Sequence, residues 1–150
     1  MSTTAERHLA SAAPHVFRLR VYWEDTDAAG IVYYANYLRF IERARSDLVR
    51  EAGIDQRALQ AEQGLTFQVR RCEIDYLAPA RLDDVLEVAT TVPAVAGASI
   101  DMRQIVRRQE AELARARVRV ACVGRDGRPR RLPPAVRQAL CGIGDVKGES

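Results

Sequence analysis

The sequence predicts an α+β domain in which a mostly antiparallel sheet packs against one long helix. Two observations carry this prediction: a single long amphipathic helical pattern at residues 36–52, and strand-like segments that fill residues 66–124 without a second long helix between them. A doubly wound parallel sheet needs helices that alternate with its strands, and these are missing. The 150 residues suit one domain.

The first half of the chain predicts a strand, a loop and the long helix. Residues 16–23 (VFRLRVYW) alternate in polarity as a first strand does, and residues 24–30 form a loop. In the helical segment, the apolar residues recur at spacings of four, three and four: Tyr37, Ile41, Ala44 and Leu48. Gly53 supplies a C-terminal stop.

The second half predicts four strands and a short helix. The first of these strands ends before Pro79, and the next two cover 85–95 and 98–106 around a break at Gly97. The last covers 113–123, where apolar residues alternate with arginines. A turn at 124–127 follows, and two prolines at 133–134 precede a short helix. We therefore expect a domain at 16–140, between a flexible N-terminal tail at 1–15 and a flexible C-terminal tail at 141–150.

Composition narrows the classes of function. The net charge of +3 comes from 23 basic and 20 acidic residues, and the short arginine clusters lack an interleaved aromatic series, so we do not expect a nucleic-acid partner. No apolar run reaches the roughly 20 residues of a membrane span. The first 17 residues have no apolar core of the signal-peptide kind. We expect a cytoplasmic protein.

The three cysteines, Cys72, Cys122 and Cys141, agree with a reducing compartment. They are odd in number, with no CxxC pair and no neighbouring histidine, so neither a disulfide framework nor a metal site is expected. Cys72 and Cys122 fall on the apolar phase of predicted strands, where we expect them to be buried.

The loop before the long helix carries the residues best suited to chemistry. Glu24, Asp25 and Asp27 lie within it, and Gly30 follows where a tight turn needs backbone freedom. A carboxylate there can act as a nucleophile or general base, and the unpaired N–H groups of a helix start can hold an oxyanion. Asp and Thr in such loops also serve as turn formers and caps, and their spacing does not separate Asp25 from Asp27.

A long motif within this region resembles the hot-dog-fold acyl-CoA thioesterases. It comprises residues 22–37 (YWEDTDAAGIVYYANY) and 40–45 (FIERAR), with further similarity at 76–84 (YLAPARLDD), 118–123 and 131–133. The resemblance covers roughly residues 16–140. It is closest to the 4-hydroxybenzoyl-CoA thioesterase family and its Tol–Pal-associated, YbgC-type branch.

The resemblance implies a curved antiparallel sheet of about five strands wrapped around the central helix. It further implies homodimers with active sites at the interface, which commonly assemble into homotetramers. No cofactor or metal is implied. Asp27 matches the position of the family's catalytic carboxylate, whereas Asp25 matches a position for which we expect a structural role.

The resemblance also suggests roles for several neighbouring residues. Some Tol–Pal-associated members have a catalytic His at the position of Tyr34, so here we expect the backbone N–H of Tyr34 to polarise the thioester carbonyl. Gly30 and Tyr33 are expected beside the substrate, and Glu42 near its acyl end, with a salt bridge of Glu42 to Arg39, Arg45 or a partner subunit as the alternative. Arg130 and Arg131 are candidates for binding the phosphates of CoA because they are basic and lie near a loop.

The function expected from the resemblance is hydrolysis of an acyl-CoA to the free acid and CoA, with Asp27 as nucleophile or general base. Two alternatives stay open: a thioesterase acting on acyl carrier protein, and a non-catalytic acyl-binding or scaffold protein of the Tol–Pal envelope machinery. A hydratase is not favoured, because its site relies on a His and this chain has none after residue 15. The sequence does not indicate the length of the acyl group.

Overall fold

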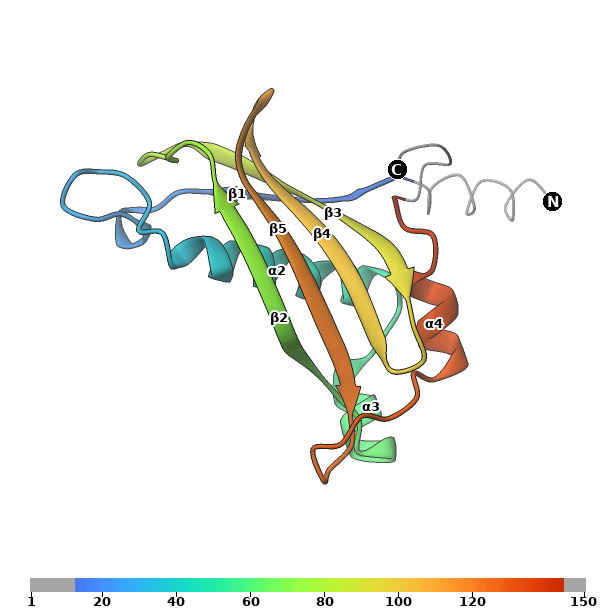
Figure 1. Ribbon diagram of the computed structural model, residues 1–150. Helices are drawn as coiled ribbons and strands as arrows, with labels where there is room; N and C mark the ends of the chain where they lie inside the picture. Colours follow the sequence, from blue (N-terminus) through green and yellow to red (C-terminus); the bar gives the residue numbers. More distant parts are fainter. Residues whose placement is uncertain (1–12, 145–150) are drawn as a thin grey trace.

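The computed structural model describes residues 13–144 and folds as one sheet curved around one helix (Figure 1). In chain order its elements are β1 (His15–Arg20), the 3-10 helix η1 (Trp23–Asp25), α2 (Asn36–Glu51), α3 (Gln56–Gln63), β2 (Thr66–Tyr76), β3 (Val85–Val95), β4 (Ser99–Arg108), β5 (Ala111–Val123) and α4 (Pro134–Leu140). The strand order is β1-β3-β4-β5-β2, with every neighbouring pair antiparallel. The predicted α+β class and hot-dog fold are confirmed.

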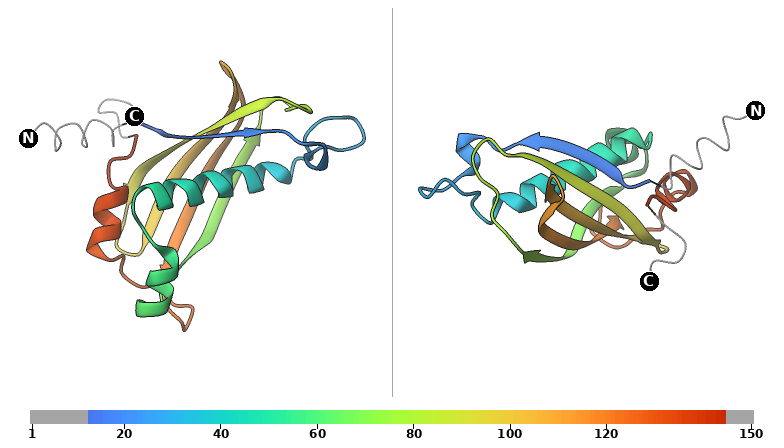
Figure 2. Two further views of the ribbon diagram at one scale, coloured as in Figure 1. Left: turned by 180° about the vertical axis from the view of Figure 1, so that it is seen from behind. Right: turned by 90° about the horizontal axis from the view of Figure 1, so that it is seen from above.

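Helix α2 lies across the concave face of the sheet, and its apolar stripe makes the core (Figure 2). The predicted stripe is confirmed: Tyr37, Ile41, Ala44 and Leu48 are all buried, as is Phe40. They pack against alternate residues of the strands, such as Val88 and Val118. No helix among residues 13–144 is both long enough and apolar enough to cross a bilayer.

Two elements differ from the sequence prediction. The first strand ends at Arg20, because residues 23–25 close a 3-10 turn. The helix α3 was not predicted, since it is short and carries no long apolar stripe. The capping residues are what could have indicated this helix. The Asp55 side chain accepts a hydrogen bond from the Ala58 N–H (3.1 Å), and Gly64 ends the helix with φ of 67°.

The strand β2 lies at an edge of the sheet and extends beyond the cover of α2 (Figure 1). It pairs only with β5, and most of its residues are exposed. Cys72 faces the helix side, like its register partner Val118, but nothing covers it, so the prediction that it is buried was wrong. Cys122 is buried, as predicted.

The ordered domain extends beyond its predicted C-terminal end. Ile143 is buried, and its carbonyl accepts a hydrogen bond from the Val92 N–H (2.8 Å), which attaches this segment to β3. At the other end, β1 already begins at His15. Of the tails predicted at 1–15 and 141–150, residues 1–12 and 145–150 lie outside the described residues.

A buried polar side chain, Gln104, joins α2 to the sheet. Its amide nitrogen donates to the Ile41 carbonyl (2.8 Å) and to Thr90 Oγ1 (3.1 Å), while its oxygen accepts from Arg45 Nη1 (3.0 Å). Gln104 and Thr90 are fully buried, and burial also lowers the pKa of the Arg45 guanidinium from its ordinary value. The contact therefore fixes how α2 sits along β3 and β4.

We predict that Gln104→Leu lowers the free energy of unfolding by about 2–3 kcal/mol, because it takes their partner from the Thr90 hydroxyl and the Arg45 guanidinium and removes the side-chain bond to the Ile41 carbonyl. Urea denaturation at fixed protein concentration measures the loss. The exposed Gln60→Leu is the matched control and should change stability by less than about 0.5 kcal/mol. Equal effects of the two substitutions would contradict the role given to Gln104.

Candidate functional site

The loop between β1 and α2 lies at the N-terminal end of the helix, anchored to the segment that leads into β3 (Figure 2). The Val21 N–H donates to the Asp84 carbonyl (2.9 Å), and Ile31 forms an isolated bridge with Arg81. A second bridge, between Thr26 and Val32, closes the loop on itself. The residues between them are held as a compact turn directly before α2.

Asp25 has a structural role in this turn. Its Oδ2 accepts a hydrogen bond from the Tyr22 N–H (2.8 Å), which caps η1. Its carbonyl accepts from the Tyr33 N–H (3.0 Å) and from Asn36 Nδ2 (2.8 Å). Asp25 therefore ties the beginning of the loop to the beginning of α2, as its expected structural role requires.

Asp27, in contrast, holds one carboxylate oxygen in place and leaves the other available. Oδ1 accepts a hydrogen bond from the Ala29 N–H (2.8 Å) and a longer one from the Ile31 N–H (3.4 Å). Oδ2 has no hydrogen-bond partner within residues 13–144. The turn is completed by a bond from the Gly30 N–H to the Asp27 carbonyl (3.0 Å), with Gly30 at φ of 79°, where a side chain is disfavoured.

The start of α2 is free of any side-chain cap. Its N-cap residue is Ala35, and no acidic residue stands in the first turn. In the described part of the chain, no acceptor bonds the N–H of Tyr34. The first three N–H groups of α2, from Asn36 to Leu38, already donate to carbonyls of the preceding turn. The available donor is therefore the Tyr34 N–H just before the helix, where the α2 dipole also favours negative charge.

Four tyrosines gather beside this helix start. Their rings contact one another in sequence in tilted and edge-to-face pairs, with centroids 4.9 Å apart for Tyr33 and Tyr34, 6.0 Å for Tyr34 and Tyr76, and 5.4 Å for Tyr76 and Tyr37. Tyr33 and Tyr34 are exposed, while Tyr37 is buried. The Tyr76 hydroxyl donates to the Tyr34 carbonyl (3.2 Å), which holds β2 against the loop.

Two of these tyrosines, Tyr37 and Tyr76, were not among the predicted site residues, although both lie in the segments that carry the family resemblance. Burial raises the pKa of both phenols above the ordinary value, so neither serves as a base at neutral pH. The Tyr37 hydroxyl accepts a hydrogen bond from the Ala80 N–H (2.9 Å), and the Ala80 carbonyl accepts from the Val32 N–H (2.8 Å). The position of Tyr37 in the apolar stripe indicated burial but not this hydrogen bond.

Glu42 lies on α2, about 9 Å along the helix axis from Asn36. It lines a cavity of about 360 Å³ between α2 and the sheet, together with Arg45 and Phe67. It also lines a hollow of about 600 Å³ on the outer side of the helix. Asp27 and Tyr34 line neither cavity.

Arg130 and Arg131 follow β5, at the opposite end of the sheet. The residue pairs Tyr76–Ala114 and Thr66–Val123 mark the two ends of the β2–β5 ladder, about 30 Å apart by strand length. Arg130 pairs with Asp126 (2.8 Å); bonds from the Arg128 N–H and from Arg130 hold the pKa of Asp126 below its usual value. The chain thus places Asp27, Gly30, Tyr33 and Tyr34 in one loop, and both arginines far from it.

Comparison with known proteins gives a consistent result. The model of the thioesterase-like superfamily matches residues 21–140. The chain is 49% identical over 107 residues to the acyl-CoA thioesterase YbgC of Haemophilus influenzae, covering 71% of this chain and 79% of that protein. It is 44% identical over 120 residues to the acyl-CoA thioester hydrolase YbgC of Escherichia coli O157:H7, covering 79% and 89%. A crystal structure of a probable thioesterase from Bartonella henselae superimposes with a TM-score of 0.75 at 39% identity, covering 80% and 99%.

We predict that Tyr37→Phe destabilises the protein by about 1–3 kcal/mol, because the buried Ala80 N–H loses its acceptor. Thermal or urea denaturation measures the change. Tyr34→Phe, which removes a phenol from an exposed ring, is the control and should leave stability within about 0.5 kcal/mol of wild type. A Tyr37→Phe protein as stable as the control would show that this hydrogen bond does not anchor the loop.

Proposed function

Because the chain belongs to the thioesterase-like superfamily, with YbgC acyl-CoA thioesterases among its relatives, we propose that it hydrolyses an acyl-CoA thioester to the free acid and CoA. One observation assigns the reaction to the loop before α2. There the helix start has no side-chain cap, and the carboxylate of Asp27 has one oxygen bound and the other available. A thioesterase needs both an oxyanion donor and a nucleophile or base.

In the proposed reaction, the thioester carbonyl oxygen accepts a hydrogen bond from the N–H of Tyr34. Negative charge grows on this oxygen as the carbonyl carbon is attacked, and the α2 dipole stabilises it. In other hydrolases, one such donor is worth about 3–4 kcal/mol of transition-state stabilisation. The Tyr34 phenol has no part in this step, so the reaction does not need the His that some relatives have at this position.

Asp27 acts on the carbonyl carbon through Oδ2, while the bond from Ala29 to Oδ1 keeps the carboxylate in place. As a nucleophile, it forms a mixed anhydride, which water then hydrolyses. As a general base, it takes a proton from the attacking water. In both cases a C–O bond forms, the C–S bond breaks, and the CoA thiolate leaves.

We propose that the site is completed by a second copy of the chain, paired through β2. This edge strand is long and largely exposed, and such a strand is a ready template for pairing. Two copies related by a twofold axis across this edge run antiparallel. That arrangement brings the Thr66 end of one β2 beside the Tyr76 end of the other.

In this pairing, the second subunit would supply the Asp27 loop with an acyl chamber and with arginines for the CoA phosphates. The 360 Å³ cavity opens along Phe67 and Val69 near the Thr66 end of β2, so the partner's cavity would lie beside the Asp27 loop. Glu42 would then line the acyl chamber. The partner subunit's Arg130 and the partner subunit's Arg131 would reach the same end, where they suit the phosphates of CoA.

Several finer expectations remain part of the proposal. A cytoplasmic location agrees with the three cysteines being free. Further assembly into a tetramer, a carrier-protein donor and an association with the Tol–Pal system follow from the resemblance alone and stay predictions.

We predict that Asp27→Asn lowers kcat at least about 100-fold, because either role of Asp27 needs a carboxylate. Free-thiol release from acetyl- to palmitoyl-CoA, with benzoyl- and 4-hydroxybenzoyl-CoA, measures turnover and identifies the acyl group. Asp25→Asn is the matched control: an amide oxygen still caps η1, and activity should stay within about threefold of wild type. Activity retained by Asp27→Asn would overturn the assignment.

We predict that Val69→Lys converts the protein to monomers and lowers its activity, since it places a charge on the exposed β2 edge. Size-exclusion chromatography with light scattering measures the mass. Val16→Lys is the control, because Val16 is equally exposed (47% against 49%) on the other edge strand, β1. Dissociation by Val16→Lys alone would place the interface at β1 instead.

A further inference from the structure

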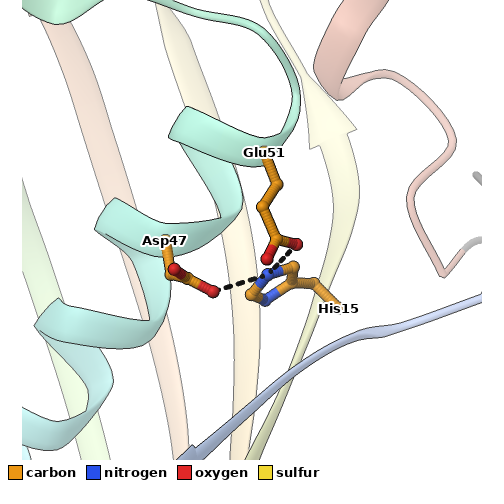
Figure 3. A group of neighbouring side chains, drawn as sticks. All are labelled: His15, Asp47 and Glu51. Carbon is orange, nitrogen blue, oxygen red and sulfur yellow. Dashed lines mark hydrogen bonds and ion pairs between the residues drawn. The ribbon is translucent and has the colours of Figure 1, made fainter.

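A cluster of three potential metal ligands joins β1 to α2, far along the helix from the Asp27 loop. His15 begins β1, and Asp47 and Glu51 lie four residues apart near the C-terminal end of α2, on the side that faces β1 (Figure 3). The proposed thioesterase reaction uses none of them. Sequence reasoning did not predict this cluster, because His15 and Glu51 are 36 residues apart.

We propose that His15, Asp47 and Glu51 form a binding site for a divalent transition-metal ion, with Zn²⁺ as the ion that best fits their donor atoms. One imidazole nitrogen and two carboxylate oxygens are a donor set that zinc takes in proteins, with water completing the coordination. Their candidate ligand atoms all lie within 4.8 Å of one another.

The distances suit such an ion closely. His15 Nε2 lies 3.2 Å from Asp47 Oδ2 and 2.8 Å from Glu51 Oε2. Tetrahedral zinc with bonds of about 2.0–2.2 Å separates its ligand atoms by about 3.3–3.5 Å. The Asp47 pair is almost at this spacing already. The Glu51 oxygen lies about half an ångström too near Nε2 for this spacing. Its side chain is 62% exposed in the last turn of α2, so it can turn to the position that zinc requires relative to both other ligands.

The environment of His15 supports a metal in preference to a simple ion pair. Its side chain is only 10% exposed, so the imidazole is held in place with Nε2 directed at both carboxylates. A single N–H donates well to one acceptor, yet two anionic oxygens face this nitrogen. A bound dication satisfies both carboxylates at once.

The other ring nitrogen leaves the required tautomer accessible. His15 Nδ1 is buried and has no hydrogen-bond partner in the part of the chain that the structure describes. No donor therefore forces the ring proton onto Nε2, and the Nε2 lone pair can be presented to a metal, with a buried Nδ1–H that has no acceptor among residues 13–144.

Asp47 is also oriented for this role. Arg50 Nη2 donates to Asp47 Oδ1 (2.9 Å), which turns Oδ2 toward His15. This is the arrangement of an outer hydrogen bond that fixes a metal-ligating carboxylate. A metal here would join the edge strand β1, which pairs only with β3, to α2.

The test is metal binding to the full-length, tag-free protein after treatment with a chelator. Zn²⁺ is titrated by calorimetry, and Co²⁺ serves as a spectroscopic probe because its visible absorption reports the coordination geometry. We expect one ion per chain, a rise in melting temperature with Zn²⁺, and tetrahedral Co²⁺ bands. The readouts need no substrate, so they stand apart from the thioesterase assay.

Two variants should each weaken Zn²⁺ binding at least about 100-fold, more than the loss of an outer-shell partner does. They are His15→Ala and Glu51→Gln, the second at an exposed site where folding is not at risk. His8→Ala removes the only other imidazole of the chain and should leave affinity unchanged. Absence of saturable Zn²⁺ binding, or unchanged affinity in His15→Ala or Glu51→Gln, would overturn the proposal and leave an ion pair between β1 and α2.

Discussion

The packing of one face of α2 against the concave side of the sheet is the interaction on which the rest of the structure depends. The helix has one apolar stripe, and the sheet has one apolar face wide enough to receive it. Gln104 adds a directional contact, because its three hydrogen bonds link α2 to β3 and β4 at a single position. The start of α2 is thereby placed beside the loop it follows, and its C-terminal turns beside β1.

A single helix does not cover the whole of this five-stranded sheet, and the uncovered part includes an exposed edge. The strand left over is β2, which explains the exposure of Cys72 and Val69 on a surface patterned like a core. The same strand carries Tyr76, whose hydroxyl donates to the Tyr34 carbonyl just before α2. The edge at which we propose that a second copy pairs is therefore also in contact with the candidate oxyanion donor.

Periodicity in the sequence predicted most of the fold, because long elements with one buried face leave a clear pattern. Residues 85–95 were predicted as a strand with the bounds that β3 has, and α2 differed by one residue. The helix α3 was not predicted, because its eight residues show little contrast between apolar and polar faces. The first strand ends earlier than predicted because a 3-10 turn follows it, and alternation of polarity does not reveal such a turn.

The site was less accessible to such reasoning. Spacing did not separate Asp25 from Asp27; a family resemblance favoured Asp27, and the hydrogen bonds now distinguish the two, with Asp25 capping η1 and Asp27 keeping one oxygen free. The cluster of His15, Asp47 and Glu51 forms only because β1 lies against α2, and local sequence patterns do not predict that contact.

The donor at the start of α2 belongs to the main chain, and this has a consequence for the evolution of the site. Of the twenty amino acids, only proline lacks a backbone N–H, so almost any codon change at Tyr34 preserves the donor. Under the proposed mechanism, position 34 can therefore change its side chain while the backbone donor is kept. Substitutions there would alter the surface beside the thioester carbonyl and leave the proposed oxyanion contact in place.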